Sequence, residues 1–135
     1  MPRITLPATT ENIEPATDFL NEVLENAGCP PRAQMQLDIA LDELMSNVAQ
    51  YAYTPETGEI TVSVEIKEDP KRAVVILTDA GTPYDPLQRE DPDITLSATE
   101  RRIGGLGIFI VKQSMDELSY EYKNKKNVVT IVKKI

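Results

Sequence analysis

Residues 37–53 read LDIALDELMSNVAQYAY and predict one long helix, around which the other elements of the chain can be arranged. Apolar residues recur in it at the helical period, so one stripe can face a core. These residues are Leu37, Leu41, Leu44 and Val48. The polar residues Asp38, Asp42 and Ser46 fall on the other side and are expected to face water.

Glu43 and Asn47 are one helical turn apart at the border of this stripe, where a helix can form the wall of a cleft. A carboxylate and an amide carbonyl in that arrangement suit a site that needs a proton acceptor beside an oxygen ligand for a hard cation. Such pairs are also common on solvated helix surfaces. Both interpretations stay open on these two residues alone.

Composition narrows the class of protein. The chain of 135 residues fits a single domain that can bury a core without disulfides, and no apolar run is long enough to cross a bilayer. A single cysteine, Cys29, fits a reducing cytoplasm. The chain has no histidine, which excludes histidine-based catalysis and phosphohistidine relays. A net charge of −8 argues against a nucleic-acid binder, because phosphate backbones attract basic surfaces.

The remaining periodicity predicts a chain that mixes helices and strands. Strands are expected at residues 3–7, 59–66, 73–77, 117–123 and 128–135, and helices at residues 11–27 and after the glycines near residue 105. Gly28 is placed as the C-terminal stop of the helix over residues 11–27. The apolar run at residues 73–77 predicts a central strand that is shielded on both faces, and it ends at Asp79.

Asp79 and Gly81 form a D-x-G pattern at the end of that strand. A carboxylate there can accept a hydrogen bond from an exocyclic amine, and glycine permits close approach of a flat ligand to the backbone. Residues 83–102 are rich in proline and charge, as expected of a functional lid or of a disordered linker. The glycines of GGLG, residues 104–107, precede a helix and could offer free N–H groups to phosphate.

Three patterns occur in a specific order: E-x-x-x-N at Glu43 and Asn47, D-x-G-x-P at residues 79–83, and GGLG at residues 104–107. In this order they resemble the N, G1 and G2 boxes of the GHKL (Bergerat-fold) ATPases. The short length, the opening ITLPA at residues 4–8, and the Ser97, Glu100 and Arg101 that precede the glycines resemble the RsbW-type anti-sigma-factor serine kinases within that superfamily.

The resemblance implies a fold and a function. The fold is an α+β two-layer sandwich, with a mixed, mostly antiparallel sheet covered on one face by three helices. It comprises residues 1–135 as one domain, with an ATP lid at about residues 84–103. The implied function is ATP-dependent phosphorylation of a serine on an anti-anti-sigma (STAS-type) partner, coupled to sequestration of a sigma factor in a bacterial cytoplasm. The resemblance leaves open whether the chain forms a homodimer.

Roles are likewise implied position by position. Glu43 would be the general base, Asn47 the ligand of Mg²⁺, and Asp79 the acceptor for the adenine amine, with Gly81 giving the ring room. The backbone of Gly104, Gly105, Leu106 and Gly107 would bind the ATP phosphates. These roles agree with the chemistry, because Mg²⁺ needs few protein oxygens besides phosphate, and phosphoryl transfer depends mainly on positioning and charge neutralisation.

Two departures leave alternatives open. Relatives commonly carry histidine where this chain has Tyr51, and Thr130 lacks the flanking Gly-Thr pattern, so Thr130 is left out of the site. The first alternative is a nucleotide-responsive regulatory module that binds ATP without kinase activity, and the second is a scaffold that binds no nucleotide. Arg101 or Arg102 could reach a phosphate or a partner, or both could be solvated.

Overall fold

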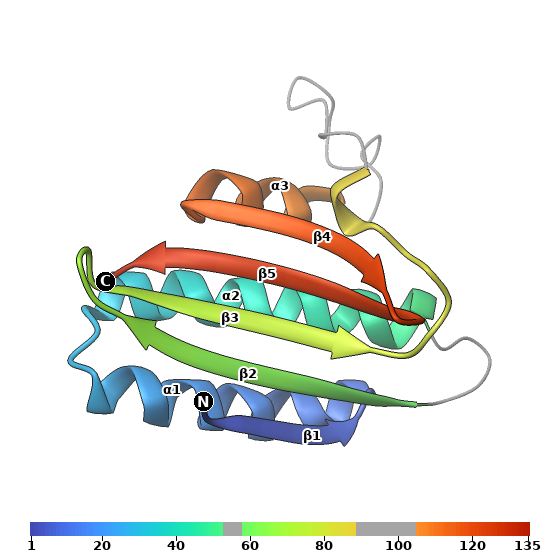
Figure 1. Ribbon diagram of the computed structural model, residues 1–135, viewed down its shortest axis with the longest axis horizontal. Helices are drawn as coiled ribbons and strands as arrows, with labels where there is room; N and C mark the ends of the chain where they lie inside the picture. Colours follow the sequence, from blue (N-terminus) through green and yellow to red (C-terminus); the bar gives the residue numbers. More distant parts are fainter. Residues whose placement is uncertain (53–57, 89–104) are drawn as a thin grey trace.

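The computed structural model describes residues 1–52, 58–88 and 105–135, which form a five-stranded sheet with three α-helices on one face (Figure 1). The strands lie in the order β1-β2-β3-β5-β4. Their bounds are β1 Arg3–Pro7, β2 Glu59–Lys67, β3 Arg72–Asp79, β4 Glu117–Lys123 and β5 Lys126–Lys134. The helices are α1 Ile13–Asn26, α2 Pro31–Asn47 and α3 Gly105–Ser114. This architecture confirms the predicted α+β two-layer fold class.

All four pairings between neighbouring strands are antiparallel, whereas the sequence analysis allowed a mixed sheet. Two of the pairings are hairpins, whose short turns permit only antiparallel neighbours. The β4–β5 turn consists of Asn124 and Lys125, with φ angles of 54° and 62°. Two central residues with positive φ match the twist of the strands that they connect.

α1 begins at Ile13, after a single 3-10 turn at Thr10–Asn12, and ends as predicted before Gly28. Gly28 has a φ of 74°, which favours glycine, and its N–H donates to the Glu25 carbonyl at 3.0 Å. The next N–H, of Cys29, donates to the Leu24 carbonyl at 3.0 Å. These two bonds satisfy carbonyls at the end of α1 and turn the chain toward α2.

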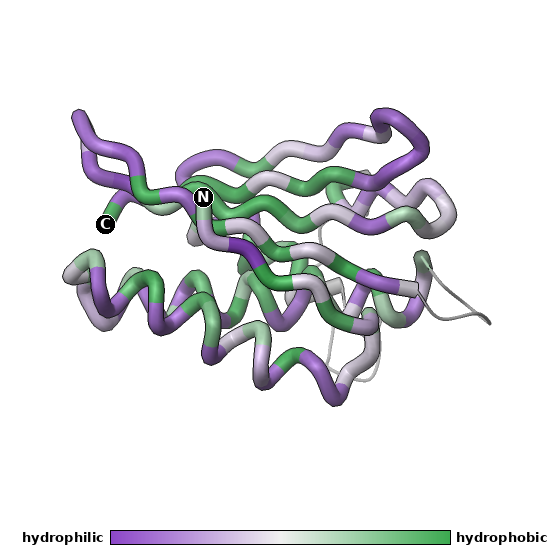
Figure 2. Tube along the Cα trace, turned by 60° about the horizontal axis from the view of Figure 1, so that its bottom comes forward, coloured by the Kyte–Doolittle hydropathy of each residue, from purple (hydrophilic) through white to green (hydrophobic). Residues whose placement is uncertain are grey.

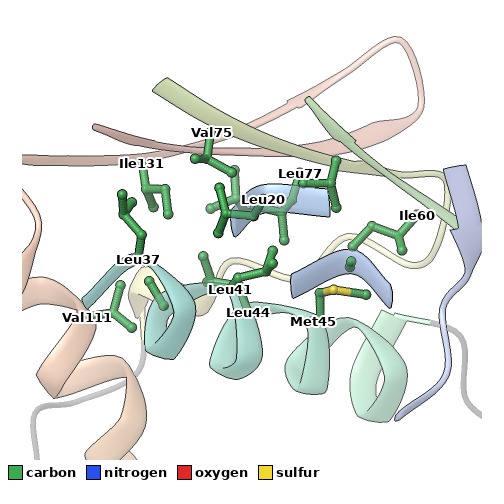
Figure 3. Packing of buried hydrophobic residues seen from close by; sticks show 14 of the residues in the cluster. Leu20, Leu37, Leu41, Leu44, Met45, Ile60, Val75, Leu77, Val111 and Ile131 are labelled. Carbon is green, nitrogen blue, oxygen red and sulfur yellow. The ribbon is translucent and has the colours of Figure 1, made fainter. Parts of the chain in front are cut away.

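α2 starts at Pro31, where the missing N–H costs no helical hydrogen bond, and it lies between α1 and α3. Its apolar stripe packs against the inner face of the sheet (Figure 3). Leu37 and Leu41 are fully buried there, opposite Val75 and Ile131. Each buried leucine contributes roughly 1.5–3 kcal/mol of transfer free energy, so this stripe anchors α2 in place.

β3 is central in the sheet, as predicted, but helices cover only one of its faces. Its residues alternate between half-buried and buried, and Val75 and Leu77 face the helices. Val74 and Ile76 face the other side and are half-buried there. The continuous apolar run therefore reflects one covered face and a second that is shielded mainly by neighbouring strands.

Hydrophobic parts of the sheet and helices face one another, and the hairpin tips are hydrophilic (Figure 2). Within the described ranges, no helix combines the length and apolar character needed to cross a membrane.

Candidate functional site

A pocket of about 330 Å³, measured with its open mouth, is lined by residues at the ends of α2 and β3, at the start of β5 and in the segments that follow α2 and β3. Most of its wall is apolar, with a few polar side chains among the lining residues. It is lined by Leu44, Asn47, Val48, Ala52, Leu77, Asp79, Tyr84, Pro86, Asn127 and Val129. An apolar slot with few polar groups suits a flat aromatic ligand that must be held in one orientation.

Asp79 is the last residue of β3 and faces the helices, with 5% of its surface exposed. Its Oδ1 accepts hydrogen bonds from the Gly81 N–H and from Asn127 Nδ2, both at 2.9 Å. Burial raises the pKa of the Asp79 carboxyl, and these two hydrogen bonds lower it. Among the described residues, none donates a hydrogen bond to Oδ2 that would compete with a ligand.

Asn127 is the site residue that the sequence analysis missed. The strand expected at residues 128–135 left it out, but Asn127 belongs to β5 and is paired directly with Asp79 across the sheet. A signal was present, because Asn127 begins the period-two series that continues with Val129 and Ile131 on the buried face. A polar residue that opens such a series is a candidate for a buried hydrogen-bonding role.

Asn47 is the last residue of α2, where the α-helix passes into a π-helix over Val48–Ala52. It is 5% exposed, and its buried Nδ2 has no hydrogen-bond partner among the residues that the structure describes. An unsatisfied buried amide costs about 1–3 kcal/mol, so a residue of this kind is expected to serve a ligand. π-helical turns are themselves frequent at functional sites.

Glu43 lies one turn before Asn47, and its carboxylate packs against Gly107 in the first turn of α3. A Cβ built on Gly107 would come within 2.2 Å of both Cδ and Oε2 of Glu43. Only glycine therefore allows α3 to approach α2 this closely. The predicted phosphate loop and the predicted base are thus neighbours.

Gly81 is required by a contact with the chain itself. A Cβ at this position would lie 2.5 Å from the Ala52 carbonyl oxygen, and that oxygen accepts a hydrogen bond from the Thr82 N–H at 2.8 Å. The sequence analysis explained the glycine by room for a flat ligand. In the structure its hydrogen faces the end of the π-helix, so close packing of loop on helix explains the residue.

Tyr51, which stands where relatives commonly have histidine, stacks on Tyr84 beside the pocket. The ring centroids are 4.9 Å apart and the planes differ by 20°. The Tyr84 N–H donates to Asn127 Oδ1 at 3.1 Å. The stack therefore connects the end of the π-helix to the hydrogen bonds around Asp79.

The other predicted residues lie as follows. Gly105 begins α3, and Leu106 follows it in the first turn. Gly104, Arg101, Arg102 and most of the predicted lid lie outside the described residues. Thr130 pairs with Ile76 and points to the sheet face opposite to Asp79, which agrees with its omission from the site.

Residues 6–133 match the family described as the histidine kinase-like ATPase domain. The chain belongs to this family. It is 33% identical to the serine-protein kinase RsbW of Listeria monocytogenes, over 93% of this chain and 82% of that protein. It is 28% identical to RsbW of Staphylococcus epidermidis, over 96% and 84%, and 23% identical to the serine/threonine-protein kinase BtrW of Bordetella bronchiseptica, over 95% and 89%.

At this similarity over most of its length, the chain also belongs to the RsbW-type branch of the histidine kinase-like ATPases, as the sequence analysis predicted. The family name refers to the ATPase fold. This chain contains no histidine, so its place in the family concerns the nucleotide-binding domain and not a histidine phosphoacceptor.

Proposed function

We propose that this RsbW-type protein is an ATP-dependent protein serine kinase and anti-sigma factor. It phosphorylates a serine on an anti-anti-sigma partner of the STAS type, and it sequesters a sigma factor in the cytoplasm. The kinase activity is supported by the similarity to the serine-protein kinase RsbW and to the serine/threonine-protein kinase BtrW. The single structural observation that carries the proposal is the contact between Glu43 and Gly107, one turn from Asn47 and its pocket.

The base of ATP would occupy the pocket, with its exocyclic amine donating to Asp79. Asp79 is buried, lines the pocket and has one oxygen that the described residues leave available. The phosphates would then extend toward Glu43 and the start of α3, where the backbone of Gly104 to Gly107 would bind them. Residues 84–103 would form the lid over them.

Asn47 would hold Mg²⁺ through its side-chain oxygen. Its buried amide lines the pocket, and the described residues offer its nitrogen no hydrogen-bond partner, which fits a side chain whose partners come from a bound ligand. Mg²⁺, when bound, neutralises charge on the phosphates and takes most of its other ligands from phosphate oxygens and water. One protein amide is therefore enough on the protein side.

Glu43 would act as the general base. The partner's serine gives its hydroxyl proton to the Glu43 carboxylate while its oxygen forms a bond to the γ-phosphorus. The bond between that phosphorus and the β–γ bridging oxygen breaks, and ADP leaves with the electron pair. This role is supported by the contact of the Glu43 carboxylate with Gly107, which belongs to the proposed phosphate-binding backbone.

The test is transfer of the γ-phosphoryl group to a STAS-type partner, measured by mass spectrometry of phosphoserine. Glu43→Gln is expected to bind ATP like the parent and to lose transfer by at least about a hundredfold. Asp42→Asn is the matched control, because Asp42 is the exposed neighbour of Glu43 on the same helix. Transfer by Glu43→Gln at the parent rate would remove Glu43 from the chemistry.

Sigma-factor capture needs its own measurement, with ATP, ADP and no nucleotide. If ATP strengthens capture, the sigma factor must strengthen ATP binding by the same factor. Equal capture in all three states would contradict nucleotide switching.

The second candidate is a nucleotide-responsive regulatory module without kinase activity. It is favoured by Tyr51, which stands in place of the usual histidine and is engaged in the stack with Tyr84. ATP binding without phosphoserine, in the parent and in Tyr51→His alike, would support this alternative over the kinase.

A further inference from the structure

Asn127 connects more of the pocket than any other polar side chain whose hydrogen bonds the structure describes. It is 2% exposed. Its Oδ1 accepts from the Tyr84 N–H at 3.1 Å and from the Tyr120 hydroxyl. Its Nδ2 donates to Asp79 Oδ1 at 2.9 Å and to the Thr82 carbonyl at 3.0 Å. One amide thus joins β3, β4 and the loop that follows β3.

The partners of Asn127 fix the orientation of its amide. The Tyr84 N–H can only donate, so it requires the oxygen on its side, and the Thr82 carbonyl can only accept, so it requires the nitrogen on the other. The Tyr120 hydroxyl adds a second donor to Oδ1, and it remains protonated because burial raises the pKa of Tyr120. A flipped amide would lose the bonds to Tyr84, Thr82 and Asp79, and could keep only one to the Tyr120 hydroxyl, with the hydroxyl as acceptor.

A fixed amide nitrogen constrains Asp79. Asn127 Nδ2 and the Gly81 N–H both donate to Oδ1, so a proton on that oxygen would disrupt these hydrogen bonds. The two bonds also restrict rotation of the Asp79 carboxylate. The other oxygen, Oδ2, is then held in one position at the pocket. A hydrogen bond between an amine and a carboxylate that is already oriented costs little reorganisation on binding.

We propose that Asn127, held by Tyr120, is a positioning residue for base recognition: it orients Asp79 so that Oδ2 accepts the exocyclic amine of adenine. This inference rests on the proposed ATP-binding function and deepens it, because it assigns amine selectivity to two residues outside the family motifs quoted above. If Asn127 had only a structural role, its substitution would lower stability and would change the affinity for every purine nucleotide by the same factor.

The readout that separates these roles is the ratio of affinities for ATP and for purine riboside triphosphate, which lacks the exocyclic amine. Because a hydrogen bond to a charged group is worth about 1.5–3 kcal/mol, the parent should favour ATP by about tenfold or more. Asn127→Ala should lower that ratio to near one. Tyr120→Phe should lower it to a value between one and that of the parent. Tyr120→Phe removes one hydroxyl from an edge strand, so it tests the idea even if Asn127→Ala fails to fold.

Asn127→Asp gives a sharper test through pH. The new carboxylate can still accept from Tyr84 and Tyr120, but it faces Asp79, and the pair is expected to share one proton at low pH. A protonated Asp at position 127 donates to Asp79 as the amide does, so the affinity ratio of this variant should recover as the pH falls. In the parent the ratio should fall with falling pH as Asp79 becomes protonated.

The other titratable groups around Asp79 and Tyr120 are Tyr122 on β4, Asp85 in the loop after β3 and Lys126 at the start of β5. They are retained in every variant, and Tyr120 itself is removed only in Tyr120→Phe. Thr130→Val, on the opposite face of β5, is the matched control and should keep the parent ratio at every pH.

The outcomes separate the two proposals. A parent that binds neither nucleotide overturns the proposed function and this inference together. A parent that favours ATP, with variants that keep the same ratio although they fold and bind, overturns the role of Asn127 alone. A ratio that falls in both variants while Thr130→Val is unchanged supports it.

Discussion

The Glu43 carboxylate lies against the backbone of Gly107, so that a Cβ at position 107 would come within 2.2 Å of Glu43 Cδ. Two residues 64 positions apart thus depend on each other, because the helix that carries the acid can approach α3 only where a side chain is missing. The start of a helix favours a nearby negative charge. The partial positive charge at the start of α3 would also favour a phosphate. The Glu43 carboxylate and a bound phosphate would then lie close together.

Gly107→Ala is therefore expected to displace the Glu43 carboxylate and to lower serine transfer by about a hundredfold, since small misplacements of a catalytic group have effects of this size. Gly107→Ala is also expected to weaken ATP binding, because the collision disturbs the start of α3. The double variant Gly107→Ala with Glu43→Ala removes the collision and should bind ATP like the parent, without regaining transfer. Calorimetry and a phosphoserine assay report the two effects separately. Transfer by Gly107→Ala at the parent rate would contradict the contact.

Asp79→Asn is expected to weaken ATP binding by about tenfold, because the amide oxygen lacks the charge that strengthens the hydrogen bond to the amine. The same variant should melt at a higher temperature than the parent at neutral pH. Asn can accept the bonds from Gly81 and Asn127, and it avoids burial of a charge.

The pH dependence follows from the pKa of Asp79, which burial raises. Because the folded protein holds this proton more tightly than the unfolded chain, stability falls as the pH rises from about 3.9, the ordinary carboxyl value, through the raised pKa. The parent should therefore lose stability relative to Asp79→Asn across that interval. Thermal melts at a series of pH values measure it, and a constant difference between the two proteins would show that Asp79 does not carry the raised pKa.

Asn47→Ala should separate stability from function. In the parent the buried amide nitrogen of Asn47 finds no partner within the described part of the chain, so its removal is expected to cost the free protein little, even with a small void left behind. The variant should lose the Mg²⁺-dependent part of ATP binding, and with it the rise in melting temperature that Mg²⁺-ATP gives the parent. An equal rise in both proteins would exclude Asn47 as a metal ligand.

Leu41→Ala tests the core that positions Glu43 and Asn47. Leu41 is fully buried on α2, and truncation at such sites typically costs about 2–5 kcal/mol. Ile39→Ala is the matched control on the same helix, because Ile39 is 43% exposed and should change stability by only about 0.5 kcal/mol. Urea unfolding curves give both values, and similar costs at the two positions would contradict the orientation of α2.

Local sequence patterns were sufficient to predict those elements whose structure depends on residues close by in the chain. The apolar stripe of α2 and the glycine after α1 each determine their element through neighbours within a turn or two of helix. The order of the three motifs then led to the family, and the fold followed from it. The sheet pairings required the structure, and they proved to be antiparallel throughout the described strands.

Long-range contacts could not be predicted in this way. Asn127 in NKKN resembles a turn residue, and its buried role appears only when β5 is placed beside β3 with Asp79 opposite. Gly81 is explained by Ala52, and Tyr51 by Tyr84, across 29 and 33 positions of sequence respectively. A residue's own neighbours carry no information about such partners, so sequence reasoning supplied a different reason or none.

The sheet order also bears on the time course of synthesis. β3 pairs with β5, which is made last of the five described strands, and the pocket takes residues from both as well as from α2. Chains emerge from the ribosome at about 5–20 residues per second. Several seconds therefore pass between the synthesis of α2 and the β2–β3 hairpin and the synthesis of β5. During that interval a nascent chain has half of the pocket and an unpaired strand edge, the state in which aggregation competes with folding. The nucleotide can then stabilise only the finished chain, and not the intermediates that precede it.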